Sequence, residues 1–258
     1  MKKLIKQIIN ALLHPLGLEM RRKADRESME GALQHIRSLG FQPATVIDVG
    51  AADGTPALYA TFPQSVHFLI EPLVEFRPQL EKWKQRYPRL DYLIAAASSQ
   101  AGEVTFHVHP DLVGSSLLRE GDDIETNGAP RRVPAVRLDD LAQQYKLQPP
   151  FLLKLDVQGA ELEVLAGGEQ TLAQAEYVIL ETVLFRFFEN GAIFDEVIHY
   201  MKTRGFSVYE IFEPGFRLLD GAMSQVDLAF VKTDGRFRQS QAYATPEQRL
   251  HQNRQLLG

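Results

Sequence analysis

Cysteine is absent from this chain of 258 residues. Its absence excludes disulfide bonds, zinc sites built on thiolates, and cysteine nucleophiles. Long apolar runs are also lacking, since no stretch approaches the roughly 18 continuous apolar residues of a membrane-spanning helix. A clean signal peptide is missing too, because polar residues interrupt the apolar start of the chain and no small-residue cleavage site follows. We therefore expect a cytoplasmic protein.

An overall excess of positive charge is lacking as well. The formal net charge is −5, which argues against nucleic acid as a partner bound through bulk charge. Residues 1–26 are the exception, with a net charge of +5 and a predicted amphipathic helix that ends at Pro15 and Gly17. Such a helix either makes a peripheral contact with the inner face of an anionic membrane, or packs on its own domain or on a second subunit of a homo-oligomer. Its apolar face comprises Leu4, Ile5, Ile8, Ile9, Leu12 and Leu13.

Strand-like apolar runs alternate with helical patterns after residue 40, which predicts an α/β fold with a mostly parallel sheet. We expect a helical extension over residues 1–40, one domain over 41–235 and a frayed or partner-bound polar tail over 236–258. Residues 109–132 have little periodicity and predict a long loop of the kind that forms lids. The predicted strands are 45–50, 66–71, 90–97, 104–108, 133–138, 151–156, 177–182, 206–212 and 226–232. The predicted helices are 29–39, 55–62, 74–87, one opening at Asp139, one from Gln158 to Gly167, and 194–204.

The first cluster of chemical residues follows the first predicted strand. Asp48 closes that strand, and Gly50 and Gly54 allow the loop behind it to turn tightly and approach a ligand. Glu71 closes the next strand, at the interval where an acid can take two ribose hydroxyls. Two acids, Asp48 and Asp53, would repel a pyrophosphate but attract a sulfonium or an amino group. The pattern therefore favours S-adenosylmethionine over NAD, with a ligand-free strand–turn–helix unit as the alternative.

The second cluster is Lys154-x-Asp156-x-x-Gly159-x-Glu161, with Glu181 at the end of the following strand. Side chains alternate along a strand, so Lys154 and Asp156 point to the same side of the sheet. The cluster is predicted at the same carboxyl edge as Asp48. A structural ion pair with a helix cap is the alternative interpretation.

Together the two motifs resemble the FkbM-type methyltransferases, over roughly residues 40–235. The resemblance implies the class I methyltransferase fold, a Rossmann-like three-layer sandwich with an antiparallel closing strand, and S-adenosylmethionine as methyl donor. It also implies an acceptor hydroxyl on a sugar, a glycan or a secondary metabolite. Two positions depart from the family pattern, Ala52 in place of asparagine and Gln158 in place of glutamate. The cofactor-binding residues implied are Asp48, Gly50, Ala51, Gly54, Glu71, Pro72, Ala96 and Asp156.

Methyl transfer to a hydroxyl is helped by a general base. Asp156 is the first candidate, because Lys154 beside it would hold it ionised, with Glu181 and Glu161 around it. His109, and with it His107, is a second candidate at the start of the predicted lid. Ser115 and Ser116 could donate hydrogen bonds there, although polar loop residues need no such role. We expect no metal, and as alternatives we retain a catalytically degenerate binding module and an NAD(P)-dependent sugar-modifying enzyme.

Overall fold

The computed structural model describes residue 15, residues 26–120 and residues 127–257. The amphipathic helix predicted over residues 4–13 lies outside them. The strands are β1 Thr45–Val49, β2 Val66–Glu71, β3 Leu90–Ile94, β4 Ala96–Ala97, β5 Gly102–Val108, β6 Ala129–Val136, β7 Phe151–Leu155, β8 Ala175–Val183, β9 Phe206–Phe216 and β10 Met223–Lys232. The helices are α2 Met29–Ser38, α3 Pro56–Thr61, η2 Val74–Phe76, α4 Arg77–Arg86, α6 Leu138–Gln144, α7 Glu161–Ala166, α8 Glu169–Ala173, α9 Phe194–Thr203, η3 Arg236–Arg238 and α10 Pro246–Leu257.

A seven-stranded sheet in the order β3-β2-β1-β7-β8-β10-β9 forms the middle layer. The pairs from β3 through β8 are parallel, and β10 runs antiparallel to both of its neighbours. The last strand thus inserts between β8 and β9 rather than at the sheet edge. This arrangement is the predicted α/β fold with one antiparallel closing strand.

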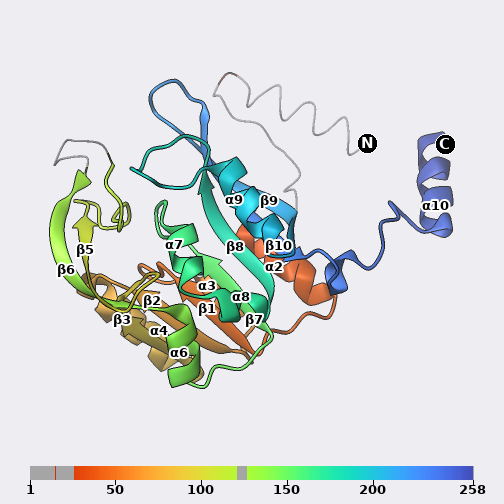
Figure 1. Ribbon diagram of the computed structural model, residues 1–258. Helices are drawn as coiled ribbons and strands as arrows, with labels where there is room; N and C mark the ends of the chain where they lie inside the picture. The colour runs from red at the N-terminus through yellow and green to blue at the C-terminus, as the bar shows by residue number, and fades with distance from the viewer. Residues whose placement is uncertain (1–14, 16–25, 121–126, 258) are drawn as a thin grey trace.

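Strand alternation divides the core into two apolar layers. Ile47 of β1 and Leu153 of β7 face a cluster that includes side chains of α6, α7, α8 and α9. Val46 and Leu152, their neighbours in sequence, face the opposite cluster, which is built with α2, α3 and α4. Helices therefore cover both faces of the sheet, as Figure 1 shows, and the carboxyl ends of the parallel strands remain open for a site.

The middle of the chain departs from the expected elements. The predicted strand 90–97 is broken, because Ala96–Ala97 leaves the main sheet and pairs with β6 in a three-stranded sheet ordered β4-β6-β5. Strand β6 begins at Ala129, inside the predicted loop 109–132. Its first residues are exposed and include Pro130, so they carry no burial pattern that sequence reading could detect.

Three helical segments contain detail that the sequence did not predict. The expected helix 74–87 is a short 3₁₀ turn followed by α4, whose second residue is Pro78. The helix that begins near Gln158 was expected to end at Gly167, with no helix directly after it. A second short helix, α8, follows Gly167 and Gly168. The polar tail contains helix α10, which opens at Pro246 and is rich in strong helix formers. In the described part of the chain no helix has the length and apolarity to cross a membrane.

Candidate functional site

A pocket of about 570 Å³ lies at the carboxyl edge of β1, β2 and β7. Five of the predicted cofactor-binding residues line the pocket: Gly50, Glu71, Pro72, Ala96 and Asp156. The other lining residues are Val49, Ala52, Ile70, Leu73, Phe76, Ala97, Phe106, Leu112, Val113, Ser115, Leu117 and Val157.

The loop after β1 is shaped by a close backbone approach. Gly50 has φ +72°, and a Cβ added there would lie 1.8 Å from the carbonyl oxygen of Asp156. Glycine is therefore required both for the left-handed conformation and for the contact between the two site loops. Ala52 also has a positive φ of 45°. Asparagine tolerates this conformation better than alanine, which gives a physical reason for the residue that the family usually has here.

Glu71 is buried at the end of β2 and braces the same loop. Its Oε2 accepts from the Ala52 N–H at 2.8 Å, and its Oε1 accepts from the Leu73 N–H at 2.8 Å. Burial raises the pKa of Glu71 to about 7, although these two backbone hydrogen bonds favour the ionised form. Each carboxylate oxygen keeps a further lone pair for a ligand hydroxyl.

Behind the pocket, Asp48, Lys154 and Asp156 form a line of alternating charge. Asp48 and Lys154 are register partners on β1 and β7, with Lys154 Nζ 3.7 Å from Asp48 Oδ1 and 3.1 Å from Asp156 Oδ2. Tyr59 donates to Asp48 Oδ2 at 3.1 Å. Burial works to lower the pKa of Lys154, but the carboxylates of Asp156 and Asp48 outweigh it and raise the pKa. The lysine is thus held as a cation.

Some of the predicted cofactor residues do not reach the pocket surface. Asp48 is fully buried and lies behind the lining, and Ala51 is buried as well. Gly54 packs against Trp83, where an added Cβ would lie 2.5 Å from the indole nitrogen. These residues shape the loop, and a direct cofactor contact from them stays a prediction.

Asp156 and Glu181 face one another across Gln158. The Gln158 Nε2 group donates to Asp156 Oδ1 at 2.9 Å and to Glu181 Oε2 at 2.6 Å. Gln225 Nε2 donates to the other Glu181 oxygen at 2.5 Å. Burial works to raise the pKa of Asp156. The positive charge of Lys154, together with hydrogen bonds from Glu181, Lys154 and Gln158, outweighs burial and holds that pKa below its usual value. Burial and the charge of Asp156 raise the pKa of Glu181, so Glu181 is the more readily protonated of the two acids.

Glu161 stabilises the loop that follows β7. It is buried in the first turn of α7, and its Oε1 accepts from the N–H groups of Val157 at 3.2 Å and Gly159 at 3.3 Å. Burial raises its pKa to about 7. These bonds fix the loop that carries Asp156. Among the described residues, no three acidic or histidine side chains are grouped so that they could hold a metal ion.

Three site residues escaped the sequence analysis in these roles: Gln158 as a bridge, Gln225 and Asp227. Asp227 pairs with Glu181 in the β10–β8 register and is buried. Burial and the charge of Asp156 raise its pKa to about 7. Asp227 is a charged residue inside the apolar run 226–231, just as Lys154 is inside the run 151–155, and this pattern could have indicated a site residue. The two glutamines gave no comparable signal.

The segment after β5 folds back over the pocket. His107 and Ser116 exchange two backbone hydrogen bonds, and Leu112, Val113, Ser115 and Leu117 line the pocket. The Ser116 hydroxyl donates to the Gln158 carbonyl oxygen at 2.7 Å. The segment thus covers the pocket and is tied to the loop that carries Asp156.

Neither histidine of this segment lines the pocket. His109 Nδ1 lies 2.8 Å from Asp111 Oδ1, in a local pair outside the lining. Burial, and next the charge of Arg119, lowers the pKa of His107. The structure therefore brings Asp156, Lys154 and Glu181 together and leaves His109 at the margin.

Comparison with known proteins gives a consistent family. Residues 48–208 match the methyltransferase FkbM domain. The 2-O-methyltransferase NoeI of Sinorhizobium fredii is 30% identical over 164 residues, which span 57% of this chain and 67% of NoeI. The hexuronic acid methyltransferase AglP of Haloferax volcanii is 28% identical over 135 residues, which span 52% of this chain and 54% of AglP. Among solved structures, a precorrin-6y C5,15-methyltransferase of Geobacter metallireducens aligns over 83% of this chain and 93% of its own, with 12% identity and a TM-score of 0.41.

Proposed function

The chain belongs to the FkbM methyltransferase family, and from that premise we propose that it methylates a hydroxyl of a sugar, glycan or glycosylated metabolite with S-adenosylmethionine. Family membership confirms the resemblance and the enzyme class predicted from the sequence. We propose the identity of the cofactor, the class of the acceptor and the roles of single residues.

The pocket fits S-adenosylmethionine in three respects. Gly50 lets the loop after β1 meet the loop that carries Asp156, because a Cβ there would clash with the Asp156 carbonyl oxygen. Glu71 presents two carboxylate oxygens at the interval that suits ribose hydroxyls. Asp156 adds a negative charge to the lining, which attracts a cationic ligand and repels a pyrophosphate. When bound, S-adenosylmethionine supplies the methyl group.

Asp156 is the proposed general base, and the position of Lys154 Nζ, 3.1 Å from Asp156 Oδ2, is the observation that carries the proposal. Lys154 lies on one of its oxygens and Gln158 on the other, and both interactions stabilise the carboxylate. The raised pKa of Glu181 beside it means that Glu181 takes up a proton more readily than Asp156 does. Asp156 can therefore accept the proton of an acceptor hydroxyl, while Glu181 and Lys154 keep it ionised and oriented.

The acceptor class is supported by the names of the two relatives. One is a 2-O-methyltransferase and the other a hexuronic acid methyltransferase, which together indicate an oxygen nucleophile and a sugar. The alternatives are less favoured. An NAD(P)-dependent enzyme does not suit the acidic lining, and a degenerate binding module does not explain the retained pair of Asp156 and Lys154.

The test compares glycan extracts from cells that carry the intact gene, the Asp156→Asn variant or no gene. We expect a glycan that gains a methyl group only with the intact protein, and a turnover at least about a hundredfold lower for Asp156→Asn. Binding of S-adenosylmethionine by the purified variant should stay within about tenfold of the intact protein. His109→Gln is the matched variant for the other candidate base. Loss of turnover in His109→Gln with activity retained in Asp156→Asn would contradict the assignment.

A cytoplasmic location, contact of residues 1–26 with a membrane, and a homo-oligomer are further proposals. Their support is the basic amphipathic pattern of those residues. Co-sedimentation with liposomes should be weaker for a chain that lacks residues 1–26, and equal behaviour would end the membrane proposal.

A further inference from the structure

The tip of the β9–β10 hairpin, residues 216–223, exposes large apolar side chains. Leu218 and Leu219 have relative exposures of 104% and 83%, and Phe216 is 61% exposed. Met223, where β10 begins, is 38% exposed. Single exposed apolar residues need no explanation, but four within eight positions form a patch of the kind that marks an interaction site.

The polar groups of the tip are satisfied within the tip itself. Arg217 donates from Nε and Nη2 to the two carboxylate oxygens of Asp220, at 2.8 and 2.6 Å. Asp220 also accepts from the Ala222 N–H at 3.0 Å. Arg217 and Asp220 together leave the tip with no net charge, so no unpaired acid opposes its approach to an anionic surface.

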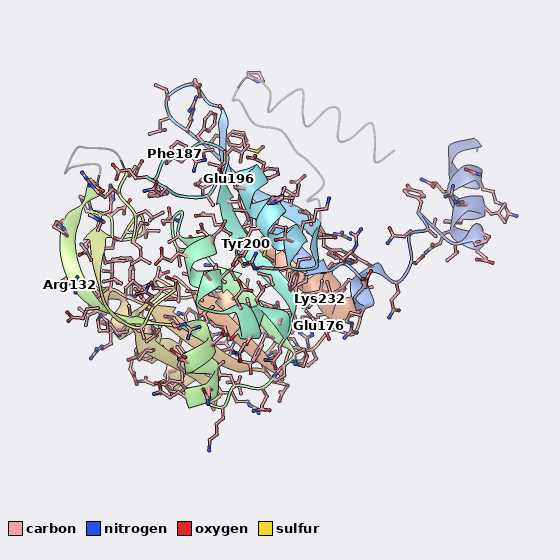
Figure 2. All side chains as sticks on the ribbon, in the orientation of Figure 1. Arg132, Glu176, Phe187, Glu196, Tyr200 and Lys232 are labelled. Carbon is pink, nitrogen blue, oxygen red and sulfur yellow. The ribbon has the colours of Figure 1, made fainter. Side chains whose placement is uncertain are left out.

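The tip stands on the same rim as the candidate site. Gln225, two residues after Met223, pairs with Val183 in the sheet and donates to Glu181. The guanidinium of Arg217 lies 3.7 Å from the ring centre of Phe185, in the loop after β8. In Figure 1 the hairpin extends past the end of β8, and Figure 2 labels Phe187 in the loop beside it.

The chain segment with the greatest positive charge joins the fold at this hairpin. Arg26, the last residue of the basic segment 1–26, pairs with Glu210 of β9. The Glu213 N–H donates to the Glu27 carbonyl oxygen at 3.2 Å, which places the entry point along the same strand. Residues 1–25, with a net charge of +4, are therefore attached to the chain at the strand that leads to the apolar tip.

These observations point to one occupant. Exposed apolar side chains on a strand to which a cationic segment is attached match a surface with an apolar interior and anionic head groups. A second copy of the chain fits less well, because a stable dimer interface takes roughly 20–30 residues from each partner, and the tip at residues 216–223 has only eight.

We propose that the tip at residues 216–223 inserts into an anionic lipid surface and holds the rim of the pocket against it, so that the acceptor is a glycan carried on a lipid. The inference rests on the proposed function for its acceptor, and on the hairpin and the charge of the basic segment for its lipid contact.

The experiment is co-sedimentation of the full chain with phosphatidylcholine vesicles, with and without phosphatidylglycerol. We expect binding that requires the anionic lipid, and a partition at least about tenfold weaker for the double variant Leu218→Glu/Leu219→Glu. The matched control is Leu250→Glu on α10, which adds one charge at a residue 59% exposed and should bind within about twofold of the intact chain. In a second measurement, brominated lipid should quench the tryptophan fluorescence that the Leu219→Trp substitution adds. The fluorescence of Trp83 in the intact chain should not be quenched.

Two results would overturn the proposal. One is a double variant that binds vesicles as the intact chain does. The other is an intact chain that is dimeric by light scattering, becomes monomeric in the double variant and ignores vesicles. Calorimetry with S-adenosylmethionine on the same samples separates this from a failure of the proposed function, because the tip lies outside the pocket and the double variant should bind the cofactor normally.

Discussion

The ammonium group of Lys154 lies 3.1 Å from Asp156 Oδ2, and both residues belong to one strand end that faces the pocket. Lys154 also lies 3.7 Å from Asp48, which is fully buried. The Lys154 ammonium therefore pairs with an acid in the core and with an acid in the site. Its removal should change both the stability of the fold and the pKa of the site acid.

Lys154→Met is expected to lower the free energy of unfolding by about 3–5 kcal/mol, because it leaves the buried Asp48 without its cation. It should also raise the pKa of Asp156, since Lys154 holds that pKa down. Urea denaturation measures the first effect and the acid limb of the pH–rate profile the second. Lys82→Met, at an exposed lysine of α4, is the control and should change neither. Equal stability of the two variants would contradict the assigned burial of the Lys154 pair.

Gly50→Ala tests the close approach of the two site loops. The new Cβ would meet the Asp156 carbonyl oxygen, so we expect a loss of about 3 kcal/mol or more in stability, together with loss of cofactor binding. Gly205→Ala is matched in conformation, with φ +79° against +72°, and its Cβ meets nothing within 4 Å among the described residues. That control measures the strain of the left-handed backbone alone, about 1 kcal/mol. Similar losses in both variants would remove the argument for the contact.

Glu181 is expected to make stability fall as pH rises. Its folded-state pKa is raised above the ordinary value of 4.5, so the folded protein binds more protons than the unfolded chain between that value and the folded pKa. The free energy of unfolding therefore decreases with pH through neutrality, by up to about 1.4 kcal/mol per pH unit from this group. Glu181→Gln should flatten the slope in urea denaturation between pH 5.5 and 8. Glu30→Gln, on the exposed side of α2, should leave the slope unchanged.

Gln158→Glu places a third carboxylate between Asp156 and Glu181. An added negative charge raises the pKa of Asp156, so the acid limb of the pH–rate profile should move upward by about one unit. Gln143→Glu, on α6, is the control for added charge away from the site and should not move it. A profile that is the same in both variants would show that the amide of Gln158 does not set the ionisation of Asp156.

Much of the main sheet follows from the sequence, because its strands are buried on both faces. Phe151 through Leu155 is an apolar run interrupted by a single lysine, and the run was sufficient to place β7 and the chemistry at its end. Strand β6 could not be found in the same way, since its first four residues are exposed and its pairing with β5 depends on contacts that no local pattern encodes.

The site was predictable where acids end strands, and less so where backbone conformation decides the contacts. Glu71 and Asp156 line the pocket as expected. Asp48 lies one residue before the end of β1, and its side chain points into the core, where Lys154 and Tyr59 contact it. The bridge made by Gln158 depends on its positive φ of 53°, which a single sequence does not reveal.

Titration calorimetry with S-adenosylmethionine and with NAD, on the intact protein and on Glu71→Gln, measures directly which cofactor the pocket binds. We expect binding of S-adenosylmethionine, no binding of NAD, and an affinity at least about tenfold lower in Glu71→Gln, because the charged acceptor of the ribose hydroxyls is lost. An intact protein that gives no heat with S-adenosylmethionine at millimolar concentration, or that binds NAD equally well, would contradict this expectation.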